Sequence, residues 1–89
     1  MTNKYGEHAA IDELKKYIDG TYSEHYVGED NIQAIDVWKS LGSLETSARD
    51  TAIKYLMRYG KKEGKNRKDL LKALHYIILM LTQNKGEKR

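Results

Sequence analysis

One segment near the C-terminal end constrains the fold more than any other. Between residues 68 and 81, large aliphatic side chains recur every three to four positions: Leu70, Leu71, Leu74, Ile77, Ile78 and Leu81. This is the period of an amphipathic α-helix with a broad apolar face. Asn66, followed three residues later by Asp69, is typical of a helix start that resembles a capping box. The sequence therefore predicts a helix with Asn66 as its N-cap.

The first half of the chain predicts two further helices. One covers residues 8–19 and ends at Gly20, and its apolar positions share a face: Ile11, Leu14 and Ile18. Residues 21–30 break this pattern and predict a polar connector. The next helix runs from Asp30, as N-cap, to Leu41, with these residues on its inner face: Ile32, Ile35 and Trp38. Gly42 follows it, a residue common after helix ends.

A fourth helical pattern begins near Ser43 and ends before Gly60. Its apolar stripe consists of Ala48, Ala52, Tyr55 and Tyr59, with Ile53 and Leu56 beside it. A break near Ser47 is an alternative, because the Ser and Thr residues there are mediocre helix formers. No strand pattern competes, so we expect an all-α fold. It would be a small bundle of three to four helices, with the last two in an antiparallel hairpin across residues 60–65.

Composition narrows the class of protein. The 89 residues suit one small domain, and no run near eighteen apolar residues or signal-peptide pattern occurs. Cysteine is absent, which excludes disulfides, thiol catalysis and Cys-based zinc sites. We therefore expect a soluble cytoplasmic protein that does not enter membranes.

Charge is divided unevenly along the chain. Residues 1–50 carry ten acids and five bases, whereas residues 51–89 carry eleven bases and three acids. Such a dipolar surface indicates a charged partner, although the two halves could also neutralise each other within one chain or in a homodimer. Monomer and homodimer both remain open.

The stretch YGKKEGKNRKDL, residues 59–70, resembles a phosphate-binding P-loop at first sight. Only three residues separate Gly60 from Gly64, Asn66 replaces the required hydroxyl, and a helix precedes the loop instead of a strand, so it is not a P-loop. A weaker anion site remains an interpretation, formed by free N–H groups at the next helix start and by nearby bases: Lys61, Lys62, Lys65, Arg67 and Lys68. The alternative is a solvated turn.

Three segments resemble a family of small phage proteins of unknown function, some described as nucleotide kinase-like although they lack a P-loop. The segments are HYVGEDNIQAIDVW (25–38), TAIKYLMRYGKK (51–62) and KDLLKALHYIILML (68–81). The resemblance implies that residues 25–84 form the family-like helical domain. Residues 1–24 would be a helical extension, and residues 85–89 a flexible basic tail.

The resemblance also implies where a site would lie. Lys54, Arg58 and Lys61 would face phosphate, and Asp36 and Asp69 would hold magnesium or orient a hydroxyl. His25 and Tyr26 match the start of the family pattern. However, the chain departs from that pattern in three places, with Gln33 for Glu, Thr51 for Asn and Lys68 for Glu. Loss of two carboxylates weakens a magnesium site and suggests a degraded catalytic site.

Other side chains allow structural and functional interpretations. His25 is a candidate ligand or base, but His8 and His75 provide no metal-ligand spacing with it, so no metal site is expected. Candidate partner-binding residues come from both charged halves of the chain: Tyr17, Tyr22, Glu24, Glu29, Asp30, Arg67, Lys68 and Lys72. Candidate anion-binding residues are all basic: Lys54, Arg58, Lys61, Lys62 and Lys65.

Three hypotheses follow from the sequence. The first is a non-enzymatic phage protein that binds a host protein, with host RNA polymerase and replication or nucleoid proteins as candidates, and with no cofactor. The second is a nucleotide kinase or nucleotide-binding protein that uses magnesium and a nucleotide. The third is nucleic-acid binding through the basic residues 54–72, which the acidic half of the chain disfavours.

Overall fold

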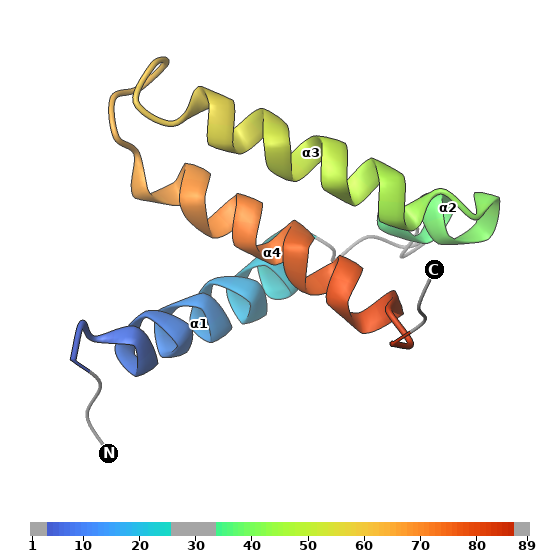
Figure 1. The fold of residues 1–89 in the computed structure, drawn as a ribbon, viewed down its shortest axis with the longest axis horizontal. Coiled ribbons are helices and arrows are strands. Elements are labelled where there is room, and N and C mark those ends of the chain that lie inside the picture. Colours follow the sequence, from blue (N-terminus) through green and yellow to red (C-terminus); the bar gives the residue numbers. More distant parts are fainter. Residues whose placement is uncertain (1–3, 26–33, 87–89) are drawn as a thin grey trace. The chain divides into compact units, whose positions relative to one another are not determined.

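A computed structural model describes residues 4–25 and 34–86 of the chain, with four helices (Figure 1). These are α1 (Glu7–His25), α2 (Ala34–Leu41), α3 (Leu44–Arg58) and α4 (Arg67–Gln83). The described residues contain no strand, so the all-α prediction is confirmed. The chain divides into two compact units, residues 1–32 and residues 33–89, which are described separately below.

The first unit contains α1, which is longer than the sequence predicts. The expected end at Gly20 is wrong, because the helix continues through this glycine to His25. Gly20 lowers helix stability by about 1 kcal/mol relative to alanine, but it ends a helix only where its backbone turns left-handed, which Gly20 does not do. The Thr21 hydroxyl donates to the Tyr17 carbonyl at 3.0 Å within this extra turn. The expected N-cap Asp30 lies outside the described residues.

In the second unit, α2 is short and leads directly into α3. Gly42 adopts a φ of 76° immediately after α2, as predicted for a helix end. The N–H of Ser43 then donates to the Trp38 carbonyl at 2.8 Å, which turns the chain back at once. As a result α2 packs beside the N-terminal part of α3 (Figure 1). The Trp38 ring of α2 lies near that of Tyr76 on α4.

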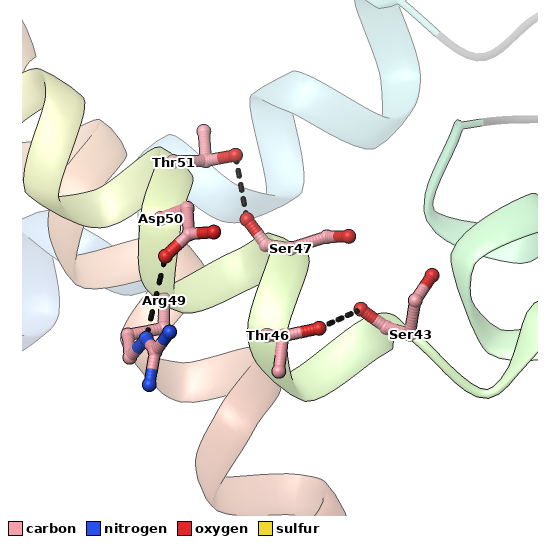
Figure 2. A network of polar contacts seen from close by, with 6 residues as sticks. All are labelled: Ser43, Thr46, Ser47, Arg49, Asp50 and Thr51. Atoms are coloured by element: carbon pink, nitrogen blue, oxygen red, sulfur yellow. Dashed lines mark hydrogen bonds and ion pairs between the residues drawn. The ribbon is translucent and has the colours of Figure 1, made fainter.

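The helix α3 is continuous, so the alternative of a break near Ser47 is not realised. Figure 2 shows the polar side chains along its first turns. The Thr46 hydroxyl donates to the Ser43 carbonyl at 3.2 Å, and the Thr51 hydroxyl donates to the Ser47 carbonyl at 2.7 Å. Arg49 and Asp50 form an exposed ion pair at 3.3 Å. The Thr46 and Thr51 hydroxyls, which could compete with the helix, are therefore satisfied on backbone carbonyls three and four residues earlier in the chain.

The antiparallel hairpin of α3 and α4 is present as predicted (Figure 1). Small side chains fill its seam, with Ala48 and Ala73 at most 1% exposed and Ala52 4% exposed. Alanines allow two helices to approach closely, which leaves larger side chains beside the seam instead of within it. The expectation that the large aliphatic stripes form the buried face is therefore partly wrong: Ile53, Leu56, Leu74, Ile77 and Leu81 are exposed.

The turn between α3 and α4 is ordered by its own backbone. Gly60 and Gly64 have φ values of 85° and 67°, and the N–H of Gly60 donates to the Gly64 carbonyl at 2.8 Å. Asn66 caps α4 as predicted, since its side-chain oxygen accepts from the N–H of Lys68 at 2.9 Å. The capping-box role of Asp69 is wrong. Its carboxylate lies beside Arg58 of α3, with 3.8 Å between Nε and Oδ1.

Candidate functional site

Three aromatic rings from three helices form a row on one side of the hairpin. The Trp38 ring on α2 lies 6.0 Å from that of Tyr76 on α4, tilted by 44°. The Tyr76 ring in turn lies 6.3 Å from that of Tyr55 on α3, with an interplanar angle of 8°. All three side chains are half-buried. The row therefore presents ring surface to solvent while it joins α2, α3 and α4.

Two lysines approach the Tyr55 ring from different helices. The Lys54 Nζ lies 4.9 Å from the ring centroid, and the Lys72 Nζ of α4 lies 5.1 Å from it. Both distances suit cation–π contacts. We call the following residues the aromatic–basic cluster, with Arg58 included because it follows Tyr55 by three residues on α3: Trp38, Lys54, Tyr55, Arg58, Lys72 and Tyr76.

The charge pair Arg58–Asp69 lies at the end of the cluster that is nearest the turn. Asp69 is buried, with its side chain 6% exposed, and it faces the Arg58 side chain, which is 33% exposed. Arg58 Nε and Asp69 Oδ2 are both buried without a hydrogen-bond partner. The pair therefore couples α3 to α4 by charge and neutralises much of the Arg58 charge. The two lysines carry the positive charge that this pair does not compensate.

His75 adds no charge to the cluster at neutral pH. Its ring lies 6.0 Å from that of Tyr76, and burial lowers the pKa of this imidazole. The uncharged form is therefore favoured. His75 is buried next to the ring row and contributes no attraction for an anion.

The start of α4 offers fewer backbone donors than the sequence suggests. The N–H of Lys68 is bound by the Asn66 side chain, and the N–H of Asp69 by the Asn66 carbonyl. In the turn, the N–H groups of Lys61 and Lys62 both donate to the Arg58 carbonyl. An anion at this end of the hairpin would therefore depend on exposed side chains: Lys61, Lys62, Lys65, Arg67 and Lys68.

The other side of the hairpin is apolar and exposed. Each helical residue rotates by about 100°, so Ile53 and Leu56 lie to one side of Ala52, and Leu74 and Ile77 lie in the same sense from Ala73. Because the two helices are antiparallel and face each other, these stripes lie on the same side of the hairpin. We call this surface the apolar face; its members are between 43% and 65% exposed: Ile53, Leu56, Met57, Leu74, Ile77 and Leu81.

The apolar face ends in a shallow depression. Ile77, Met80 and Leu81 of α4 line it together with Glu45 and Asn84, and its volume is about 250 Å³. Its lining is mainly apolar, with one carboxylate at the rim. A single large aliphatic or aromatic side chain would fit there.

The other predicted residues lie in the first unit, outside the described residues, or on α2. Tyr17 and Tyr22 belong to α1, in the first unit. Glu24 and His25 are the last two residues of α1, but their side chains lie outside the description, as do residues 26–33 with Tyr26, Glu29 and Asp30. Asp36 is an exposed residue of α2, whereas Asp69 is buried in the first turn of α4.

The sequence analysis did not predict three features of the site. It assigned Trp38 to the core, whereas this ring is the half-buried end of the aromatic row. It also missed that Asp69 faces Arg58 and that Lys72 faces Tyr55. The predicted hairpin could have indicated these pairs, because a tight turn determines which residues of α3 and α4 lie opposite each other.

Two observations concern the part of the chain that the structure describes. Within it, no three His, Asp or Glu side chains come together in a group that could hold a metal ion. None of its helices combines the length and the apolar character that a membrane crossing requires.

These features define a small all-α protein whose helical hairpin has one apolar and one aromatic–basic side. The chain belongs to DUF3310, a family of proteins of unknown function, because the family model matches residues 21–78. The match includes the last turn of α1, all of α2 and α3, and most of α4. Comparisons with curated proteins and with solved structures give no match.

Proposed function

We propose that this protein is a small non-enzymatic binding protein that attaches to another protein through its apolar face. The observation that supports this is the exposure of six large aliphatic side chains on one side of a two-helix hairpin. Exposed apolar patches of this kind commonly mark protein interaction sites. Two helices with an open apolar side also have the geometry of an incomplete three-helix bundle, which a partner helix would complete.

Charge favours a partner helix with acidic flanks. Residues 33–89 carry thirteen bases and six acids, a net charge of +7. At the turn end of the hairpin, Arg67 and Lys68 are exposed beside the start of α4. An amphipathic helix with an apolar stripe and acidic residues at one end would match both the apolar face and this basic end.

The resemblance to phage proteins supports a host protein as the partner. In this proposal the protein acts in the cytoplasm of an infected bacterium and alters a host assembly. Host RNA polymerase and the replication or nucleoid machinery are the candidates that the sequence resemblance suggests. Binding, without chemistry or a cofactor, would be the whole activity.

The test is a matched capture experiment from bacterial lysate treated with nuclease. Immobilised wild-type protein is compared with Leu56→Gln/Ile77→Gln, which removes apolar surface, and with Lys54→Gln/Lys72→Gln, which leaves the apolar face intact. We expect one host protein to bind the wild type and the lysine variant but not the apolar-face variant. Capture of the same protein by all three would contradict the proposal, as would capture of none.

A second candidate function is nucleotide binding at the aromatic–basic cluster. The specific observation is that Lys54 and Lys72 both contact one half-buried tyrosine ring, that of Tyr55, while Arg58 lies beside Asp69. Lysines and an arginine suit phosphate groups, and a ring suits a base. This candidate would make the protein a nucleotide kinase-like phosphotransferase or a nucleotide-binding protein.

Thermal unfolding tests this second candidate. Nucleoside mono- and triphosphates, with and without magnesium, should raise the wild-type Tm by mass action if they bind the folded state. Lys54→Gln/Lys72→Gln should remove the shift, and Leu56→Gln/Ile77→Gln should retain it. An unchanged Tm with every nucleotide, together with no phosphoryl transfer, would exclude the candidate.

A further inference from the structure

The aromatic row is longer than one ligand ring requires. Three rings follow one another from α2 through α4 to α3, with centroid separations of 6.0 and 6.3 Å. Both separations are nearly twice the rise of about 3.4 Å between stacked bases in duplex DNA. A ligand that uses successive rings must therefore be stretched, as an extended single strand can be and a stacked duplex cannot.

Positive charge runs alongside the rings. Lys54 and Lys72 hold their ammonium groups within about 5 Å of the Tyr55 ring, and Arg58 lies one turn further along α3 from Lys54. The exposed bases of the turn continue this track: Lys61, Lys62, Lys65, Arg67 and Lys68. Asp69 is an acid within the track, but it is buried and paired with Arg58. Glu63 is an exposed acid of the same turn, but the exposed bases of residues 61–68 outnumber it by five to one. A phosphate backbone would therefore meet mainly cations here.

The contacts around Tyr55 are also easily exchanged. Lys54 is exposed, so its ammonium group can leave the ring and pair with a phosphate while a base takes its place on the ring. Such an exchange replaces a cation–π contact by a stacked base and an ion pair. Seven of the chain's acids lie in residues 1–32, outside the unit that carries the cluster. Within residues 33–89, bases outnumber acids by thirteen to six.

From this geometry we infer a single-strand binding site: the aromatic–basic cluster stacks bases of single-stranded nucleic acid on Tyr55, Tyr76 and Trp38. Lys54 and Lys72 contact the phosphates that connect these bases. Recognition is by ring stacking and charge, so it is tolerant of sequence. The site is separate from the apolar face and goes beyond the proposed attachment to a protein.

The probe is a fluorescein-labelled oligothymidylate of about twelve nucleotides, followed by anisotropy at about 50 mM salt. Trp38 is the only tryptophan of the chain, so quenching of its emission reports stacking at the end of the row. We expect saturable binding, quenched Trp38 emission, and at least tenfold weaker binding of the matching duplex and of thymidine monophosphate. Oligouridylate in the same assay shows whether RNA binds equally well.

Variants separate stacking from charge. Tyr55→Leu should weaken binding roughly tenfold, whereas Tyr55→Phe keeps the ring and should stay within about twofold of wild type. Lys54→Gln/Lys72→Gln should lower the slope of log affinity against log salt by about 1.4, the value for two lost phosphate contacts on a single strand. Lys15→Gln/Lys16→Gln changes two exposed lysines of α1 and serves as the charge-matched control, with an unchanged slope.

Circular dichroism confirms that each variant is folded, and the lysine variants test the site even if Tyr55→Leu does not fold. Four results would overturn the inference. They are no binding at low salt, equal binding of duplex, equally strong binding of thymidine monophosphate, and equal loss of affinity in the α1 lysine control. Competition by polyglutamate as effective as that by oligothymidylate would also overturn it, in favour of a general acidic partner.

Discussion

The two sides of the α3–α4 hairpin share one seam and differ in almost everything else. On one side, Leu56 and Ile77 and their neighbours expose aliphatic surface with few polar groups. On the other side, Tyr55 and Tyr76 stack, and lysines cover the ring. The alanine seam helps to explain the contrast, because a seam of small residues leaves most large side chains on a flank, although Leu44 and His75 are buried. The flanks are therefore available for binding, while the alanines determine the fold.

The largest expected effect comes from the seam, on which both sides depend. Ala73→Asp places a charge at a position that is 1% exposed between the two helices. We expect a loss of roughly 3 kcal/mol or more in the free energy of unfolding, because a buried unpaired charge is among the costliest substitutions. Urea denaturation followed by circular dichroism measures it. Leu56→Asp, on the exposed flank of α3, is the control and should cost less than about 1 kcal/mol.

Similar losses for these two variants would contradict the division into seam and flanks. They would mean that the apolar face is buried to the same degree as the alanines. By contrast, we expect Ala73→Asp to lose both the Trp38 contacts and binding at the apolar face, because neither side can form without the hairpin.

The sequence predicted the helices and the hairpin because those depend on local periodicity and on residues that end or cap helices. Asn66 and Gly60 were identified correctly from such local chemistry. The division into two sides could not be predicted in this way. A broad apolar stripe such as that of α4 does not show which of its residues face the neighbouring helix, and small residues such as Ala73 carry little hydrophobic signal. Cross-helix partners such as Arg58 and Asp69 depend on register, which the turn determines.

The second-largest effect concerns the charge pair at the turn end of the aromatic–basic cluster. Arg58→Met leaves the Asp69 carboxylate, 6% exposed, without its cation. We expect a loss of roughly 2 kcal/mol, below the value for a fully buried pair because the Arg58 side chain is about one-third exposed. Asp69→Asn should cost less than about 1 kcal/mol, since the remaining guanidinium reaches water.

The double variant Arg58→Met/Asp69→Asn makes this test specific to the pair. Its loss should be smaller than the sum of the two single losses, because removing both charges leaves neither one buried alone. Additive losses in this cycle would mean that Arg58 and Asp69 do not stabilise each other. The cluster would then be held together by its rings alone.

The N-cap of α4 should make an intermediate contribution to stability, and its loss should affect both sides of the hairpin equally. Asn66→Ala removes the side-chain oxygen that accepts from the N–H of Lys68 at 2.9 Å. A lost N-cap of this kind typically costs about 1 kcal/mol. Asn66→Asp keeps the acceptor and should retain wild-type stability within about 0.5 kcal/mol. Thermal unfolding of the three proteins measures the difference, and equal Tm values for Asn66→Ala and the wild type would show that the cap is not needed.

The substitutions with the smallest effects on stability should distinguish the binding properties of the two sides most clearly. Ile53 and Lys54 are neighbours in α3, both are exposed, and they lie on opposite sides of the hairpin. Ile53→Gln and Lys54→Gln should each change the free energy of unfolding by about 0.5 kcal/mol or less, because neither residue fills the seam. Their binding defects should nevertheless differ. Ile53→Gln should weaken capture of the proposed partner protein and leave oligothymidylate affinity unchanged, whereas Lys54→Gln should do the reverse. If either variant impaired both activities while it remained folded, the two sides would form one continuous binding surface, and the separation of functions proposed for them would be wrong.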